Sequence, residues 1–216
     1  EGCILNAPRP YPVSVRHVIG HLLPDLVMGC LHQVVPDRVA AEGASCLWNP
    51  PMRGGASVSG QARGNRPVVS DFEIITFNSG GTGARRTLDG LDATAFPSGV
   101  RTMPVEATEN VSPLVFWRKE LREGSAGAGT TRGGFGQVME VGTKGELEYA
   151  VNATFDRIAN APRGRDGGGD GAPGAVRLKT GKVLRPKGFQ VIPDGDRLIL
   201  ELPGGGGMGD PAARDP

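Results

Sequence analysis

The chain has 216 residues, of which 38% are hydrophobic, so it is long enough to bury a core. Its formal net charge is +1, and no run of lysine and arginine alternates with aromatic residues, which argues against nucleic acid and anionic membranes as partners. The sequence predicts no signal peptide and no membrane span. Three cysteines, Cys3, Cys30 and Cys46, fit no C-x-x-C spacing, which favours reduced thiols and a cytoplasmic location.

Residues 1–48 are predicted to form an extended opening followed by an amphipathic helical segment. The opening GCILNAPRPYP is typical of the interior of a longer polypeptide. From Val15 to Val34 apolar residues recur at three- and four-residue steps, which predicts one buried helical stripe. Pro24 lies inside this pattern, so we expect either a kink or two helices, the second of which begins at Pro24.

The rest of the chain predicts strands joined by glycine-rich connections. Residues 49–67 have almost no apolar content and predict a long surface loop. Residues 68–216 predict a β-rich body, and within it residues 160–174 predict a mobile loop. The expected fold class is α+β, a single domain in which the helical segment packs on a mostly antiparallel β-rich body. Strands are predicted at residues 68–77, 113–121, 135–141, 147–155, 175–178, 188–192 and 196–202.

Two glycine motifs superficially match a dinucleotide fingerprint. G-x-G-x-x-G can be traced through Gly169, Gly171 and Gly174, and again through Gly204, Gly206 and Gly209. A dinucleotide site needs such a motif after a strand and at the start of a helix, and neither trace has that context. The sequence therefore does not predict nucleotide binding by this chain.

His17, His21 and Asp25 are spaced at i, i+4 and i+8 on the predicted helix. This spacing places them on one face, where two imidazoles and a carboxylate could hold a divalent metal. A solvated or interfacial polar face gives the same pattern, and it is the favoured interpretation. His17 and His21 are thus weak metal candidates only.

The tract from Phe77 to Glu106 concentrates small, polar and acidic residues. Its first loop can present several backbone N–H groups to a carboxylate, a phosphate or a developing oxyanion. Acidic side chains follow, and a second turn leads to an arginine. A structural turn in which the aspartates cap neighbouring backbone is an equally good interpretation of the residues alone. The candidate residues are Asn78, Gly80, Gly81, Gly83, Asp89, Asp92 and Arg101.

Four collinear blocks of the chain resemble the B component of ATP-dependent N-methylhydantoinases, the hydantoinase B/oxoprolinase family. They are GCILNAPRP with SVRHVIGHLLPDLVMGCL, GGTGARRTLDGLDATAFPSGVRTMPVE, RGGFGQVMEV, and KGFQVIPDGDRLILELPGGGGMGDP. The resemblance spans nearly the whole chain and corresponds to the C-terminal portion of longer family members. In place of the family's common asparagine this chain has Thr102.

The resemblance implies a hydrolase acting on cyclic amides within a hetero-oligomer. An A component would bind ATP and Mg²⁺ and phosphorylate a hydantoin, 5-oxoproline or similar lactam, and the B component would open the ring. Asn78, Gly80, Gly81 and Gly83 would line the activated substrate, Asp89 and Asp92 would be catalytic by orienting it, and Arg101 would hold charge. A divalent metal, Mn, Zn or Fe, would bind upstream of the region present here.

Two alternatives remain open at this point. Relatives in the acetone and acetophenone carboxylase group imply activation of a ketone for carboxylation instead of ring opening. The chain could also be a non-catalytic assembly module that docks the A component through its helical segment and glycine-rich tail.

Overall fold

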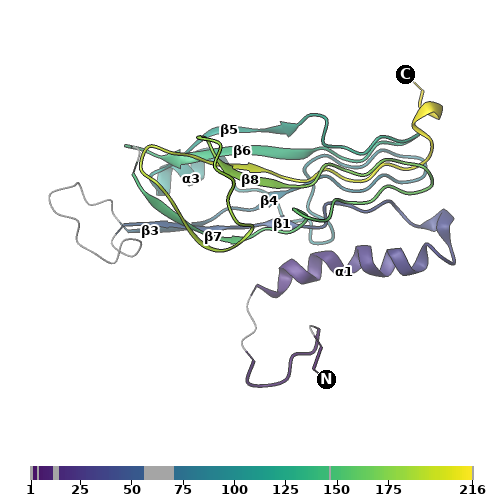
Figure 1. Cartoon of the computed structure of the whole chain (residues 1–216), viewed down its shortest axis with the longest axis horizontal. Coiled ribbons are helices and arrows are strands. Elements are labelled where there is room, and N and C mark those ends of the chain that lie inside the picture. The colour runs from purple at the N-terminus through teal and green to yellow at the C-terminus, as the bar shows by residue number, and fades with distance from the viewer. Residues whose placement is uncertain (1, 4, 12–14, 56–70, 146, 216) are drawn as a thin grey trace.

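The computed structural model describes residues 2–3, 5–11, 15–55, 71–145 and 147–215. A long helix, α1 (Arg16–Leu31), runs along one side of an elongated body (Figure 1). The strands occupy one half of this body, and extended segments without regular strand pairing occupy the other half. A short helix, α3 (Val105–Val111), precedes the longest of the described strands. Short 3₁₀ turns lie at Pro36–Arg38 and Pro211–Ala213.

The described strands form two four-stranded sheets and one short pair, and all the pairings among them are antiparallel. The first sheet has the order β5 (Leu114–Arg122), β6 (Gly136–Thr143), β10 (Leu198–Glu201), β8 (Ala175–Leu178). The second has the order β3 (Phe72–Ile75), β2 (Pro51–Gly54), β7 (Tyr149–Thr154), β9 (Lys187–Ile192). The short pair joins β1 (Leu47–Trp48) to β4 (Asn78–Ser79).

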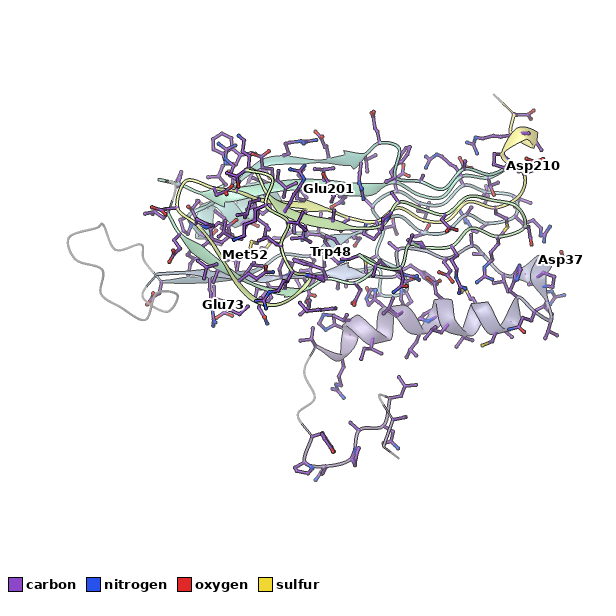
Figure 2. All side chains as sticks on the ribbon, viewed as in Figure 1. Asp37, Trp48, Met52, Glu73, Glu201 and Asp210 are labelled. Carbon is purple, nitrogen blue, oxygen red and sulfur yellow. The ribbon has the colours of Figure 1, made fainter. Side chains whose placement is uncertain are left out.

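The hydrophobic core lies between the two sheets, because both contribute to a single buried cluster. Trp48 and Met52 lie in this strand-rich half (Figure 2) and are fully buried. The Trp48 ring packs on Phe155 with 4.6 Å between centroids, and its Nε1 donates to the backbone oxygen of Asp156. Tyr149 is also fully buried and donates from its hydroxyl to the Val141 carbonyl at 2.8 Å. The polar atoms of the large aromatic residues are therefore satisfied inside the core.

The other half of the body is a glycine bundle, which we define as residues 41–44, 80–84, 126–134, 162–172 and 203–209. The segment 203–209 lies at its centre, since hydrogen bonds join it to each of the other four segments. Examples are Gly206 N to the Glu42 carbonyl, Gly127 N to the Gly205 carbonyl, and Gly207 N to the Gly169 carbonyl, at 2.8 to 2.9 Å. A strand in a flat sheet bonds to only two neighbours. The segment 203–209 is hydrogen-bonded to four neighbours, so the segments pack as a bundle and not as a flat sheet.

Glycine is required in the bundle because the extended segments approach too closely for a Cβ. A Cβ on Gly205 would lie 1.9 Å from the Thr82 carbonyl oxygen, and one on Gly133 would lie 1.9 Å from the Gly205 oxygen. Collagen follows the same rule, since only glycine fits where its extended chains meet. Both G-x-G-x-x-G traces run into this bundle, where most of their glycines face backbone atoms. The sequence therefore concentrates glycine here for packing.

The structure confirms the predicted α+β class and all seven predicted strands within the described residues. Three features differ from the expectation. Residues 51–54 form β2 inside the predicted 49–67 loop, while residues 56–70 lie outside the described part. Residues 160–174 are predicted to be a mobile loop, but residues 162–172 of this segment are hydrogen-bonded into the glycine bundle. Helix α1 passes through Pro24 without a break, so the two-helix alternative is wrong.

Helix α1 turns a mixed face toward the body, whereas an apolar face was expected there. The side chains of Val18, His21 and Asp25 are buried. The apolar stripe is buried or half-buried from Val18 to Leu23 and exposed beyond it, with Leu26 62% exposed and Val34, just after the helix, 79% exposed. Within the described residues, no helix combines the length and apolar character needed to cross a bilayer.

Candidate functional site

A cavity of about 210 Å³ lies between α1 and the glycine bundle. Met28 of α1 forms part of one wall, and Ala41, Leu91 and Phe96 form apolar parts of the others. Gly81 and Gly83 of the predicted substrate loop also line it. The sequence presents the helical face and the predicted substrate loop as separate motifs. In the structure both line this one cavity.

The polar end of this cavity is formed by Asp25 and Ser45, which come from α1 and from the segment before β1. Ser45 Oγ donates a hydrogen bond to Asp25 Oδ2, and Arg157 Nη2 lies 3.1 Å from the same oxygen. Asp25 is only 5% exposed. Burial raises the pKa of its carboxyl group, and this effect outweighs the opposing hydrogen bond from Ser45 and the charge of Arg157.

An ion-pair network continues from Asp25 away from the cavity, and it is buried at Asp25, Glu42 and Arg157 but exposed at Arg163. Arg157 Nη1 also contacts Glu42 Oε2 at 3.0 Å, and Arg163 Nε donates to Glu42 Oε1 at 2.7 Å. Burial by itself would raise the pKa of Glu42, but the hydrogen bonds from Arg163 and the nearby Arg157 lower it overall. Two carboxyl groups thus face two guanidinium groups. Larger solvent-filled spaces of about 650 and 530 Å³ border this network, and Asp25 and Glu42 line both.

The predicted catalytic residues Asp89 and Asp92 lie beside the bundle and bind arginines of the chain. Arg132 Nη1 donates to Asp92 Oδ1 at 2.9 Å, and Arg214 holds both oxygens of Asp89 at 2.8 Å. The hydrogen bond from Arg214 is the main cause that lowers the pKa of Asp89 to about 2. Burial opposes ionisation of Asp92, but Arg132 and the Phe135 N–H lower its pKa overall. These ion pairs connect the loop that carries Asp89 and Asp92 to the segments that carry Arg132 and Arg214. The catalytic role of the two aspartates stays a prediction.

The predicted substrate-binding residues occupy four different environments. Asn78 is fully buried and donates from Nδ2 to the Trp48 carbonyl at 2.9 Å. Gly80 packs against Ala44 and Pro203, because a Cβ there would lie 2.4 Å from both. Gly81 and Gly83 line the cavity, as described above. Arg101 is exposed and does not line the cavity.

The histidine candidates do not come together with other ligands. His17 Nε2 lies 3.1 Å from Asn49 Oδ1, and His21 is buried, which lowers the pKa of its imidazole. In the part of the chain that the structure describes, no three His, Cys, Asp or Glu side chains gather as a metal site. Most glycines of the two G-x-G-x-x-G traces pack against backbone atoms, so they are not free to approach a phosphate.

Three further residues of this region, Ser45, Glu42 and Arg157, were not indicated by any sequence pattern. Glu42 and Ser45 lie in the short run AAEGASC, where two polar side chains interrupt small residues. Ser45 and Arg157 both adopt left-handed backbone angles, with φ of 41° and 59°. Such angles are uncommon outside glycine and concentrate at functional sites, but they become visible only in the structure.

Comparison with known proteins places this geometry in context. The chain is 31% identical over 223 residues to a protein of Pseudomonas sp. (strain NS671) whose name proposes it as the B component of a D-/L-hydantoinase, and the match covers 100% of this chain and 35% of that protein. It also matches the crystal structure of the ATP-dependent caprolactamase from Pseudomonas jessenii, with a TM-score of 0.76 and 25% identity over 97% of this chain and 37% of that one. The nucleotide-free structure of an acetone carboxylase shares the fold, with a TM-score of 0.62 and 18% identity over 86% of this chain and 28% of that one.

The chain therefore spans about a third of the length of the relatives it matches most fully. The sequence model of one family, described as hydantoinase B/oxoprolinase, matches residues 1–211, nearly the entire chain. Since that match runs through α1, both sheets and the glycine bundle, the chain belongs to the hydantoinase B/oxoprolinase family.

Proposed function

We propose that this chain forms the C-terminal part of the B component of an ATP-dependent enzyme that opens cyclic amides. The observation that supports it most is the family match over residues 1–211, together with the likeness to the ATP-dependent caprolactamase over 97% of the chain. The glycine-bundle half also has a cavity in which an inward-facing carboxyl group meets the predicted substrate loop.

The proposed chemistry divides between two components. An amide is a poor electrophile, and phosphorylation of its oxygen by ATP in the A component makes the ring carbon easier to attack. Water then adds to that carbon, the C–N bond breaks with the nitrogen leaving as an amine, and a second water releases phosphate from the acyl phosphate. ATP and Mg²⁺ belong to the A component, and this chain contributes walls and positioning groups.

A reconstituted enzyme tests this proposal. The full B polypeptide that carries this chain would be purified with its A component and incubated with ATP and 5-oxoproline, hydantoin or caprolactam. We expect ADP release matched by ring-opened product for at least one of these amides. ADP release that depends on acetone and bicarbonate, and not on any amide, would overturn the hydrolase assignment in favour of a carboxylase.

An assembly role is the second candidate, and the exposed apolar face of α1 favours it. Leu26, Val27 and Leu31 are each about half exposed or more. The glycine-rich tail, by contrast, is buried at residues 202–208 and cannot serve as the docking surface that the sequence suggested. We assign the α1 face to the remaining two thirds of a family-length B polypeptide, since the matched relatives are about three times longer. Leu26→Lys should then lower the yield of soluble full-length polypeptide while leaving this chain by itself folded.

A further inference from the structure

The polar end of the cavity under α1 is built from residues that the backbone holds in unusual conformations. Five described residues other than glycine have a positive φ, and two of them, Ser45 and Arg157, are the side chains that contact Asp25. A left-handed conformation is unfavourable for these residue types and persists only where surrounding structure imposes it. The fold therefore constrains the backbone at both residues that orient the Asp25 carboxyl group.

The charges around this end balance within the chain. Asp25 and Glu42 face Arg157 and Arg163, so the network holds two acidic and two basic groups. Burial lowers the pKa of the neighbouring His21, which favours its neutral form. Because these four side chains already pair with one another, a charged ligand inside the cavity would have no partner among them. An uncompensated buried charge is very unfavourable. The cavity interior accordingly suits a neutral molecule. Arg85, which is exposed at its edge, could meet an acidic substituent outside.

The size of the cavity restricts the ligand further. An apolar cavity of about 150 Å³ is known to hold one benzene molecule. The cavity here, at about 210 Å³, therefore has room for a single ring of roughly five to seven atoms. Its apolar walls, including Met28, Leu91 and Phe96, suit the methylene side of such a ring.

The chemistry of the polar end matches one kind of ring. In a small lactam the ring forces the amide to be cis, so that its N–H and C=O lie on the same edge. That edge needs one acceptor and one donor close together. Asp25 and Ser45 supply this combination if Ser45 turns its single O–H, which donates to Asp25 in this structure, to the ring C=O. Asp25, still held by Arg157, then accepts the ring N–H.

We propose that the cavity between α1 and the glycine bundle binds a neutral five- to seven-membered cyclic amide, with Asp25 and Ser45 on its polar edge. This inference rests on the proposed function, which it deepens by naming the place where the ring is held. Asp25 and Ser45 act here as binding and positioning residues. The arginine-bound Asp89 and Asp92 lie outside the lining of this cavity.

Binding of small rings to the purified chain tests the inference directly, without ATP or a partner. The probes are 2-pyrrolidinone and caprolactam, with cyclohexanone as a ring of similar size that lacks the N–H, each titrated by ligand-observed NMR. We expect both lactams to bind in a saturable way and cyclohexanone to bind at least about tenfold more weakly, the effect of one lost hydrogen bond. Ser45→Ala should weaken lactam binding about tenfold for the same reason.

Two further variants keep the test independent of folding defects. Leu91→Trp places a large ring in the cavity at a position whose side chain is more than half exposed, so the chain should fold and lactam binding should be lost. Ser98→Ala changes an exposed serine that does not line the cavity, and it should bind lactams like the unmodified chain. Absence of lactam binding, or binding that survives both Ser45→Ala and Leu91→Trp, overturns the inference.

The outcomes separate this inference from the proposed function. If the reconstituted enzyme opens lactams with ATP but Leu91→Trp has no effect on binding or turnover, the ring is held elsewhere and only this inference fails. If lactams bind in the cavity but no amide supports ADP release in the reconstituted enzyme, the binding site stands and the hydrolase assignment fails.

Discussion

Asp89 and Asp92 illustrate how far individual residues could be interpreted from the sequence. Their spacing around Gly90 was compatible with a substrate site or with a structural turn. The structure places them against Arg132 and Arg214, which are 40 and more residues away in the chain. No local pattern indicates such long-range partners. Conversely, Asp25 was visible as part of a helical face, but Ser45 and Arg157 were not, because their positions depend on backbone angles that tertiary packing imposes.

The Asp89 pair gives a prediction about acid stability. The pKa of Asp89 in the folded chain, about 2, lies below its ordinary value of 3.8, so its contribution to stability is present above pH 3.8 and is lost as the pH falls towards 2. Because the Asp89 side chain is 35% exposed, solvent screening reduces this contribution to about 1 kcal/mol. Urea unfolding at about pH 5 and about pH 2.5 should show a smaller loss of stability for Asp89→Asn than for the unmodified chain. Equal losses in both proteins would contradict the assigned ion pair.

At the scale of elements, the sequence predicted strands better than it predicted the orientation of the helix. Strand-like runs located seven of the strands, whereas β2, which is as short as β3, β8 and β10, lies in a segment that was predicted to be a loop. The apolar stripe of α1 was expected to face inward. The body beneath α1 instead presents acidic and basic side chains, so His21 and Asp25 are buried together with Val18, and the stripe is exposed from Leu26 onward. Periodicity reveals that a helix has two faces, but not which neighbour each face meets.

The orientation of α1 can be tested with two matched substitutions on the same helix. Leu26→Lys should change the free energy of unfolding of this chain by no more than about 0.5 kcal/mol, because the leucine is 62% exposed. Val18→Lys should destabilise the chain by about 2 kcal/mol or more, since Val18 is buried and the lysine would lose its hydration. Chemical denaturation followed by circular dichroism measures both. A large cost for Leu26→Lys with little cost for Val18→Lys would reverse the assigned orientation.

At the scale of the whole molecule, two different kinds of packing hold one body together. The strand-rich half buries large side chains between sheets, and the glycine-rich half packs backbone directly against backbone (Figure 1). High glycine content is typical of mobile segments when only composition is considered. Here the glycines lie where five extended segments meet. The sequence shows the glycines but not their partners, since the segments are separated by tens to more than a hundred residues.

A pair of glycine substitutions tests this architecture. Gly205→Ala should destabilise the chain by about 3 kcal/mol or more, because its Cβ would lie 1.9 Å from the Thr82 carbonyl oxygen, which belongs to the backbone. Gly20→Ala is the control, since nothing in the described part of the chain lies within 4 Å of the added Cβ in α1, and it should stabilise the chain by about 0.5 to 1 kcal/mol through helix propensity. Thermal unfolding should therefore shift in opposite directions for the two variants. Similar shifts would show that the glycine bundle is looser than described.

The central place of residues 198–209 also has a consequence for biosynthesis. This stretch supplies β10, which lies between β6 and β8, and it supplies the segment to which all other parts of the glycine bundle are hydrogen-bonded. A ribosome makes residues 41–172 first, so four extended segments leave the exit tunnel before the partner that they share. Neither the sheet that contains β10 nor the glycine bundle is complete until translation has passed residue 209. We therefore expect the nascent chain to depend on holding chaperones until this stretch has left the exit tunnel.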